Sequence, residues 1–323
     1  MCRFVVYFGN TNSVLIRLAD LITRPTHSII HQSYNSKLRL TGLNPCMNGD
    51  GFGIGWYPPK TGNEQGEVAS PCIFLSVTPA WNNMNLHRLC ETIYSRLVFA
   101  HVRAASPGSI TSQANCHPFK FQNLLFMHNG AVHNFAKLKR RLLSVLSDDI
   151  FNGVQGSTDS EHCFALFLQL LADAEALEIS KHKRYPVEQL EQAMVGTVRV
   201  LGKWARELGT GDCSMLNFVV SDGYSIVATR FIDHPENEPA SLYYASGSKF
   251  ECKERTGEQF WYHMTQHDRR HFCHIIASEP LTENKREWVP VPRNHILVIE
   301  DGSNLLMYDI DEAESTPIEP IRE

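Results

Sequence analysis

Short apolar runs, separated by turn-forming residues, dominate the N-terminal half of the chain. Such runs predict β-strands when they are rich in β-branched and aromatic side chains and are flanked by Gly, Pro and Asn. We expect strands over residues 3–8, 52–57, 73–77, 97–102 and 124–127.

The spacing of apolar residues changes in the middle of the chain. After Asn134, which could cap a helix, apolar residues recur every three to four positions. A second helix is expected to begin within residues 157–161, where Thr158 and Glu161 have the spacing of a capping box. A third helix is expected over residues 187–208. The middle of the chain is therefore predicted to be helical.

Strands return in the C-terminal part, where we expect them over residues 215–221, 225–230, 242–246, 272–277 and 296–300. Two blocks of strands around a helical block predict an α+β fold, in which two antiparallel sheets enclose a core and the helices lie outside. One domain is expected over residues 2–300. Residues 309–323 contain six acids and one Arg, so a mobile tail is expected there.

Composition narrows the class of protein. The 323 residues are 43% hydrophobic, which is typical of a globular protein, and the net charge of −5 argues against a nucleic-acid partner. The first apolar run, residues 4–8, is too short for a signal peptide or a membrane anchor. Nine cysteines without a C-x-x-C motif favour reduced thiols. We therefore expect a cytoplasmic protein with no membrane partner.

Two motifs could indicate a metal or a cofactor. His267 and His271 have the spacing of a zincin pair, but Asp268 stands where that motif has Glu, and an apolar strand is predicted directly afterwards. The glycines within residues 49–55 lack dinucleotide-binding spacing and lead into a strand, which favours close approach of a backbone or a ligand. No metal and no cofactor is expected.

Cys2 directly follows Met1. If Met1 is removed, Cys2 carries a thiol and a free α-amino group, whose ordinary pKa values are about 8.5 and about 7.7 to 8.0. The amine could accept the thiol proton and later deliver it to a leaving amine. Cys2 is therefore a candidate nucleophile with its own base, although a Cys at this position also fits chance.

Three further motifs could bind a substrate. His101 and Arg103 share one face of a strand end, and a buried Arg needs an anion, either a ligand carboxylate or an internal salt bridge. The Asn129 amide and the Gly130 N–H could donate to an oxyanion, although Asn-Gly is also a turn signal. Asp159 in a first helical turn is favoured by the helix dipole, or it could bind an ammonium group.

The order of these motifs resembles that of class II glutamine amidotransferases, over roughly residues 2 to 280. The motifs are Met1-Cys-Arg-Phe4, Gly49 to Gly55, His101-Val-Arg103 with Ser106, His117-Pro-Phe119, His128-Asn-Gly130 and Ser157-Thr-Asp159. The resemblance implies the four-layer α/β/β/α sandwich of the N-terminal nucleophile hydrolases. It also implies that Cys2 is the nucleophile.

The same resemblance implies roles for the other site residues. Asn129 and the Gly130 N–H would form the oxyanion hole. Arg103 would bind the substrate α-carboxylate and Asp159 its α-ammonium, while Ser106 and His117 would line the pocket. Many members have an Arg just before the glycine-rich turn, where this chain has Asn48. Free glutamine is therefore a less secure substrate than the γ-glutamyl class as a whole.

Four stretches resemble one branch of this family, which acts in glutathione degradation in fungi with a metallopeptidase-like protein partner. They are Arg24 to Ser28, Met47 to Gly53, Pro79 to Asn83 and Gln155 to Ser160. This resemblance implies cleavage of the γ-glutamyl bond of glutathione, giving glutamate and Cys-Gly, within a complex. The alternatives are a glutaminase or ammonia-supplying subunit, a hydrolase of another γ-glutamyl compound, and a non-catalytic scaffold.

Overall fold

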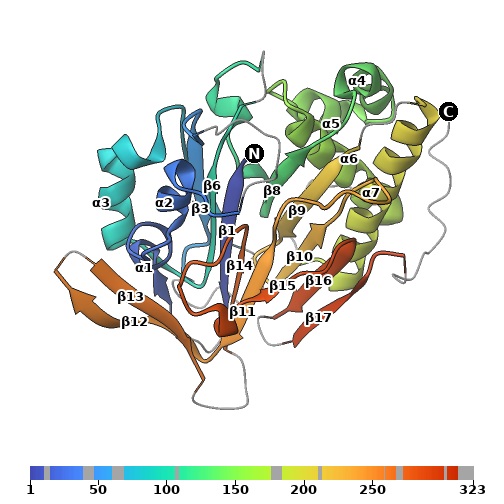
Figure 1. Cartoon of the computed structure of the whole chain (residues 1–323). Helices are drawn as coiled ribbons and strands as arrows, with labels where there is room; N and C mark the ends of the chain where they lie inside the picture. Colours follow the sequence, from blue (N-terminus) through green and yellow to red (C-terminus); the bar gives the residue numbers. More distant parts are fainter. Residues whose placement is uncertain are drawn as a thin grey trace.

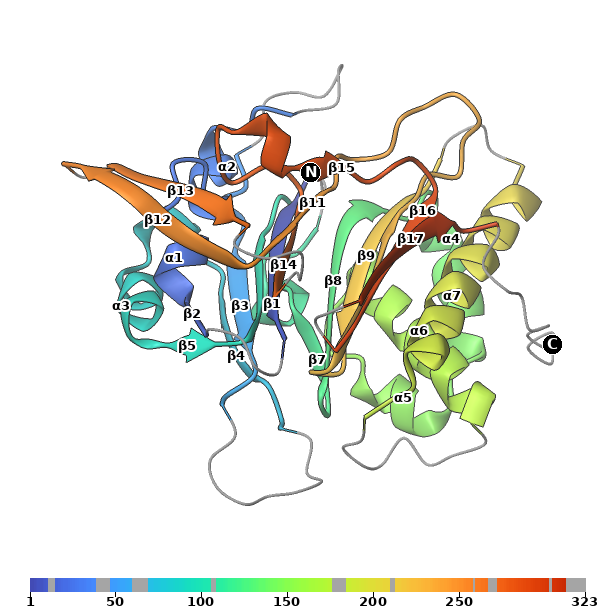
Figure 2. The same ribbon diagram turned by 90° about the horizontal axis from the view of Figure 1, so that it is seen from below.

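The computed structural model describes residues 1–10, 15–38, 47–59, 69–105, 109–175, 184–209, 213–257, 259–266, 272–301 and 304–311. Two β-sheets pack face to face, and helices cover the outer side of each (Figures 1 and 2). This is the four-layer α/β/β/α arrangement that the sequence predicts. Ser106, the His267 and His271 pair, and residues 312–323 of the expected tail lie outside the described residues.

The first sheet has seven strands in the order β15-β11-β14-β1-β6-β3-β4. Their bounds are β1 Arg3–Gly9, β3 Phe52–Trp56, β4 Cys72–Ser76, β6 Leu97–Val102, β11 Tyr243–Gly247, β14 Cys273–Ala277 and β15 Val289–Pro290. The helices on its outer side are α1 Leu18–Ile22, α2 Ile29–Tyr34 and α3 Met84–Thr92. Its central strand is β1, which pairs antiparallel with β6 and β14.

Strand β1 is apolar throughout because both of its faces are buried. Val5 and Tyr7 pack in the cluster beneath α1, α2 and α3, whereas Phe4 and Phe8 point into the core between the sheets. Side chains alternate between the faces of a strand, so a central strand of a four-layer fold needs apolar residues at successive positions. Cys2 therefore directly precedes a strand that is packed on both faces.

The second sheet has six strands in the order β17-β16-β10-β9-β8-β7. Their bounds are β7 Phe119–Phe121, β8 Leu124–Ala131, β9 Met215–Ser221, β10 Ser225–Arg230, β16 His295–Glu300 and β17 Asn304–Asp309. The helices on its outer side are α4 Phe135–Ser144, α5 Asp148–Gly153, α6 Asp159–Glu175 and α7 Val187–Glu207. Strand β17 lies beyond residue 300, so the sheet extends past the domain end expected from the sequence.

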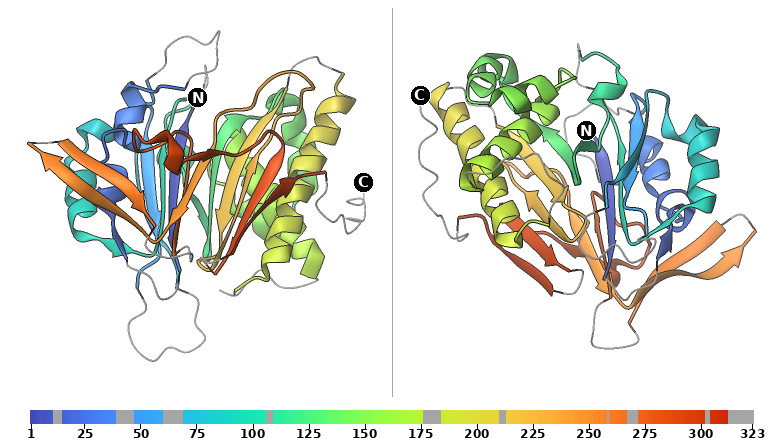
Figure 3. Two further views of the ribbon diagram at one scale, coloured as in Figure 1. Left: turned by 60° about the horizontal axis from the view of Figure 1, so that its bottom comes forward. Right: turned by 180° about the vertical axis from the view of Figure 1, so that it is seen from behind.

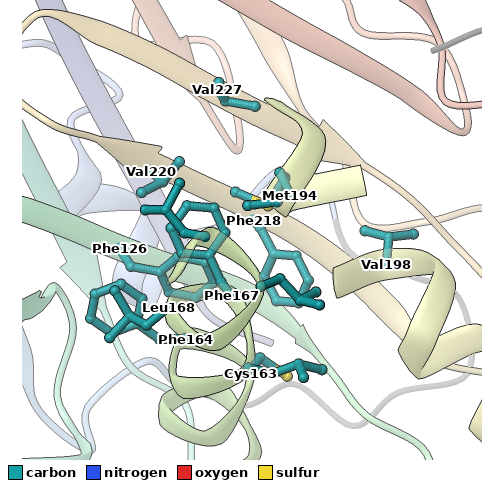
Figure 4. Close-up of a cluster of buried hydrophobic side chains, with 14 of the residues drawn as sticks. Phe126, Cys163, Phe164, Phe167, Leu168, Met194, Val198, Phe218, Val220 and Val227 are labelled. Carbon is teal, nitrogen blue, oxygen red and sulfur yellow. The ribbon is translucent and has the colours of Figure 1, made fainter. Parts of the chain in front are cut away.

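An aromatic cluster fixes α6 on the second sheet (Figure 4). The ring of Phe126 on β8 lies 5.0 Å from that of Phe164 on α6 and 5.2 Å from that of Phe218 on β9, measured between centroids. Aromatic pairs at this separation contribute packing energy beyond the burial of their area. The first residue of α6, Asp159, is therefore held in a fixed place beside the end of β8.

The remaining elements are short or lie at the edge of the body. They are β2 Ile16–Arg17, β5 Tyr94–Ser95, η1 Ala80–Asn82, η2 Gln113–Asn115, η3 Lys285–Glu287 and the hairpin of β12 Lys249–Thr256 and β13 Gln259–Thr265. The hairpin projects away from the two sheets (Figure 3). Within the described ranges, no helix is long and apolar enough to span a membrane.

Two local predictions were wrong in detail. The strand expected to end at residue 127 continues to Ala131, because residues 125–131 pair with β9, so Asn129 and Gly130 lie within the strand. Asn134 precedes α4 with a φ of 51° and forms no side-chain cap. The capping box at α6 is half formed: the Glu161 N–H donates to Thr158, while the Glu161 carboxylate accepts from the Gln155 and Gly156 N–H groups.

The glycine cluster of β3 serves close packing between the sheets. A Cβ on Gly53 would lie 2.1 Å from the His117 carbonyl oxygen, and one on Gly55 would lie 2.8 Å from Cγ of Pro118. Only glycine fits at such separations, so the interpretation of this cluster as a site of backbone approach is confirmed.

Candidate active site

Cys2 lies immediately before β1, and β1 contacts β8 of the facing sheet. In Figure 3 the N-terminus is seen beside both sheets. The Cys2 thiol is half-buried, and its Sγ accepts from the Ala104 N–H at 3.5 Å. Burial raises the pKa of this thiol, while the Ala104 N–H and the charge of Arg103 act in the opposite direction. Burial is the largest of these effects, so the thiol form is favoured overall, and the cation and the backbone donor reduce the cost of forming the thiolate.

The peptide joining Met1 to Cys2 is held by two side chains. Nδ2 of Asn48 donates to the Met1 carbonyl oxygen at 2.9 Å and to that of Val102 at 3.3 Å. Nη1 of Arg3 donates to the Met1 carbonyl oxygen at 3.4 Å and to that of Cys2, in the next peptide, at 2.8 Å. Asn48, the residue that departs from the family pattern, thus lies directly at the bond whose cleavage would free the α-amino group of Cys2.

A buried carboxylate anchors Arg3. Oε1 of Glu279 lies 2.8 Å from Nε of Arg3, and its Oε2 lies 2.8 Å from Nε2 of His27. Burial alone would raise the pKa of Glu279, but the bonds from His27 and Ser36 and the charge of Arg3 lower it to about 2. The carboxylate stays ionised and fixes Arg3 beneath Cys2. No sequence motif indicated Glu279.

Asn129 points from β8 toward the first sheet and is fully buried. Its Nδ2 donates to Oγ of Ser278 at 3.3 Å, and the same Oγ accepts from the Phe4 N–H at 3.0 Å. The amide therefore lies next to β1, two residues from Cys2. Its Oδ1 has no hydrogen-bond partner within the described part of the chain.

Gly130 follows on β8 and has no room for a side chain. A Cβ there would lie 1.9 Å from the Met215 carbonyl oxygen and 2.7 Å from Nε2 of His128. The close approach of β9 therefore demands glycine, and it leaves the surface beside Asn129 as bare backbone. Such a surface can bring a main-chain N–H close to a ligand.

Asp159 lies in the first turn of α6, as expected, and its carboxylate reaches the end of β8. Its Oδ2 accepts from the Val132 N–H at 2.8 Å, and its Oδ1 accepts from the Ser160 N–H at 2.8 Å. The carboxylate is half-buried, and its charge reaches the Cys2 thiol, whose pKa it raises. The structure thus places a negative group near the sulfur, beside the strand that carries Asn129.

Arg103 is buried, with 3% of its surface exposed, and its guanidinium donates to neutral acceptors among the described residues. Nη1 donates to the Asp50 carbonyl oxygen at 3.3 Å, and Nη2 donates to Oγ of Ser109 at 2.6 Å and to the Ile110 carbonyl oxygen at 3.4 Å. Among the described residues, no carboxylate forms an ion pair with it. The internal salt bridge considered from the sequence is therefore not seen there.

Three buried imidazoles surround the site. Burial lowers the pKa of His101 to about 3, and it lowers the pKa values of His117 and His128 as well. The rings of His101 and His117 lie 4.0 Å apart. Neither ring nitrogen of His117 finds a hydrogen-bond partner among the described residues. These imidazoles are therefore neutral at physiological pH and add polar groups, but no charge, beside the site.

The structure brings together most of the residues that the sequence singled out. The charges of Arg103 and Asp159 act on Cys2, and Asn129 lies beside the start of β1, with Gly130 next to it on β8, whereas Ser106 lies outside the described residues. Within the described ranges, no three His, Cys, Asp or Glu residues are grouped so that they could hold a metal ion. The site contains a thiol, an amide donor, a cation and a carboxylate.

Comparison with known proteins assigns the family. A model described as glutamine amidotransferases class-II matches residues 29–322. Over 317 residues the chain is 43% identical to the probable glutamine amidotransferase DUG3 of Saccharomyces cerevisiae, covering 97% of this chain and 85% of that protein. The chain belongs to the class II glutamine amidotransferases. It is therefore an enzyme of the N-terminal nucleophile hydrolase type.

Further relatives agree with this amidotransferase assignment. The γ-glutamyl-hercynylcysteine sulfoxide hydrolase of Mycolicibacterium smegmatis is 31% identical over 132 residues, which are 41% of this chain and 52% of that protein. A glutamine aminotransferase class-II domain protein from Silicibacter pomeroyi has a TM-score of 0.57 at 22% identity, covering 96% of this chain and 99% of that one. Glutamine phosphoribosylpyrophosphate amidotransferase from B. subtilis has a TM-score of 0.53 at 15% identity, covering 96% and 49%. The two structures confirm the fold.

Proposed function

We propose that this amidotransferase cleaves the γ-glutamyl bond of glutathione and releases glutamate and Cys-Gly. The coarser activity, hydrolysis of a γ-glutamyl amide, follows from the family and its relatives. The observation that carries the proposal is that two separate charged groups lie near Cys2. One is the buried Arg103, which has no carboxylate partner among the described residues, and the other is Asp159. A cation and a carboxylate near one thiol suit the α-carboxylate and α-ammonium of a glutamyl group.

The proposed reaction begins at Cys2 after Met1 has been removed. The α-amino group accepts the thiol proton, and the thiolate attacks the γ-carbonyl carbon of the substrate. Nδ2 of Asn129 and the N–H of Gly130 donate to the oxyanion that forms. Loss of one such donor costs on the order of a hundred- to a thousandfold in rate.

The second half of the reaction frees the product. The α-ammonium of Cys2 protonates the leaving amine, so the C–N bond breaks and a γ-glutamyl thioester remains on Sγ. The α-amino group then takes a proton from water, which attacks the thioester carbonyl carbon and releases glutamate. Each proton that the amine accepts is returned to a leaving group, so no further base is required.

We further propose that the enzyme works in the cytoplasm in a complex with a metallopeptidase-like protein partner. Support comes from the four sequence stretches that resemble the glutathione-degrading branch and from the 43% identity to DUG3. The partner would receive Cys-Gly, which is a dipeptide with a free amino end. The mycobacterial relative supports a second candidate, namely hydrolysis of another γ-glutamyl compound.

The direct test compares the wild-type chain with Cys2→Ala, each with and without the candidate partner. We expect glutamate release from glutathione by the wild-type complex and none by the variant. Full activity of Cys2→Ala would overturn the mechanism. If glutamine or another γ-glutamyl amide is turned over faster than glutathione, that compound and not glutathione is the substrate. If no glutamine-like diazoketone labels Cys2, the non-catalytic scaffold becomes the better explanation.

A further inference from the structure

Asn115 connects the two segments that hold the charged groups of the candidate site. It is the last residue of η2 and has 1% of its surface exposed. Its Nδ2 donates to the Ile110 carbonyl oxygen at 2.8 Å and to Oγ of Ser157 at 3.3 Å, and its Oδ1 accepts from the Ser157 N–H at 2.9 Å. One planar amide thus bonds to two chain segments that are about 45 residues apart in sequence.

The first of these segments contacts Arg103. The Ile110 carbonyl oxygen that accepts from Asn115 also accepts from Nη2 of Arg103, and Ser109 beside it accepts from the same nitrogen at 2.6 Å. A shift of the Ile110 peptide would therefore move two of the acceptors that orient the guanidinium. Asn115 thereby helps to fix the direction of the buried cation.

The second segment leads directly into Asp159. Ser157 stands two residues before Asp159, which is the first residue of α6. The same segment is held from the helix side, because the Glu161 carboxylate accepts from the N–H groups of Gln155 at 2.9 Å and Gly156 at 2.6 Å. Asn115 and Glu161 therefore both hold the segment that leads to Asp159, through the N–H groups of residues 155–157.

The contact between the two segments is tight at Gly156. A Cβ on this residue would lie 2.4 Å from Oδ1 of Asn115 and 2.8 Å from the Ala114 carbonyl oxygen. A real Cβ cannot lie this close to either oxygen, so any other residue at position 156 would force the backbone to move. The spacing of the two segments is thus set by one amide and by the absence of one methyl group.

We propose that Asn115 is a positioning residue that sets the separation of Arg103 and Asp159. It thereby selects substrates that carry both an α-carboxylate and an α-ammonium group. This inference rests on the roles given to Arg103 and Asp159 in the proposed function. Asn is required because the two segments present an acceptor, the Ile110 carbonyl, and a donor, the Ser157 N–H. Asp would keep only the acceptor, and Ala neither group.

The test combines Asn115→Ala with three chromogenic anilides. One is γ-glutamyl, one lacks the α-amino group (glutaryl), and one lacks the α-carboxylate (4-aminobutyryl). For the γ-glutamyl anilide we expect KM to rise about tenfold or more with kcat changed less, since coupled contacts are lost. For the two truncated anilides, which use one anchor each, KM should rise less than about threefold because their binding does not depend on the separation.

Two further variants keep this test decisive. Asn115→Asp retains the acceptor for the Ser157 N–H, and Gly156→Ala displaces the same contact from the other side, so both should reproduce the unequal effect on KM. Asn123→Ala is the matched control, because Asn123 is fully buried in the turn before β8 and donates to the Asp222 carbonyl oxygen at 2.9 Å. This control should lower the melting temperature and leave the KM ratios unchanged.

The outcomes separate this inference from the proposed function. If the wild-type complex hydrolyses no γ-glutamyl compound, the proposed function fails, and the assignment of Asn115 fails with it. If the wild type is active and Asn115→Ala changes KM equally for all three anilides, the proposed function stands and the positioning role is overturned. An unchanged KM for the γ-glutamyl anilide overturns it as well.

Discussion

Asn129 and Ser278 join the two sheets directly behind the nucleophile strand. Nδ2 of Asn129 donates to Oγ of Ser278 at 3.3 Å, and this oxygen also accepts from the Phe4 N–H at 3.0 Å. Ser278 also donates its own N–H to the Phe4 carbonyl oxygen at 2.9 Å. One hydroxyl thus sets the position of the candidate oxyanion donor relative to the strand that begins after Cys2.

Replacing Ser278 by Ala should separate orientation from direct contact with substrate. We expect kcat to fall roughly tenfold with KM nearly unchanged, because a small misplacement of a catalytic group costs up to about a hundredfold. The buried Phe4 N–H would also lose an acceptor, at about 1–3 kcal/mol of unfolding free energy. Steady-state kinetics and urea unfolding measure the two effects.

Ser241→Ala is the control for this change. The Ser241 hydroxyl donates to the Ser278 carbonyl oxygen at 2.8 Å, and within the described part of the chain it forms no hydrogen bond with Asn129 or Phe4. We expect a smaller loss of kcat than for Ser278→Ala. Equal losses in the two variants would show that Asn129 does not depend on the Ser278 hydroxyl.

The fold was predictable because burial leaves a clear pattern in its main elements. Apolar runs predicted β1, β3, β6, β9 and β10 to within one residue at either end, since both faces of each strand are covered. Helices α1 and α2 have five and six residues, too few to show a helical period. In α3 only Leu86 and Cys90 are buried, and β12 is largely polar and exposed, so these elements gave no such signal.

The sequence predicted those site residues whose role follows from a local motif. It did not predict those whose role depends on contacts formed in the folded chain. Cys2, Arg103 and Asp159 could be proposed from residue type and order. Glu279 and Asn115 could not, because their partners lie 276 and 42 residues away in sequence, respectively, and become visible only when the sheets assemble. A buried polar residue next to an apolar strand carries no sign of which distant group it will bond.

Glu279→Gln should destabilise the protein in a pH-dependent way. The pKa of this carboxyl is lowered to about 2, whereas an unfolded Glu titrates near about 4.3. Its contribution to stability is therefore present above about pH 4.3 and is lost as the pH falls toward about 2. At neutral pH the variant leaves Arg3 buried without a carboxylate, and we expect a loss of about 3 kcal/mol or more by urea unfolding.

The gap between wild type and Glu279→Gln should narrow when unfolding is repeated below about pH 4. Glu283→Gln is the matched control, because its partner Lys37 is half exposed and surface pairs contribute at most about 1 kcal/mol. A gap of the same size at pH 7 and pH 3 would mean that the charge of Glu279 is not what stabilises Arg3.

Arg103→Lys should weaken binding of the substrate and spare the chemical step. Lys lacks the planar fork that can hold a carboxylate with two parallel bonds while it donates to Ser109. Charge-assisted bonds are each worth about 1.5–3 kcal/mol, so we expect KM for γ-glutamyl substrates to rise roughly 10- to 100-fold. Initial-rate kinetics measure this change.

A donor that lacks the α-carboxylate is the control for Arg103→Lys. The KM of this substrate should be high with the wild type and should change little in the variant, because it has no α-carboxylate to contact Arg103. A large further increase with this donor would place Arg103 in a structural role. Arg141→Lys, on the exposed face of α4, should leave both KM values unchanged.

Gly130→Ala tests whether the backbone beside Asn129 must stay bare. The added methyl would lie 1.9 Å from the Met215 carbonyl oxygen, so β8 and β9 would have to move apart at the candidate oxyanion hole. We expect overpacking to cost about 1–3 kcal/mol of unfolding free energy. We also expect kcat to fall on the order of a hundredfold, since one donor is displaced. Thermal unfolding and glutamate release measure the two losses.

Gly153→Ala provides the comparison, because no atom lies within 4 Å of a Cβ at that position, the last of α5. This variant should keep full activity, and its stability should change by less than about 1 kcal/mol. The two glycines differ in what surrounds them and not in chemistry. If Gly130→Ala behaves like Gly153→Ala, β9 does not approach Gly130 closely, and the candidate oxyanion hole does not require bare backbone at this position.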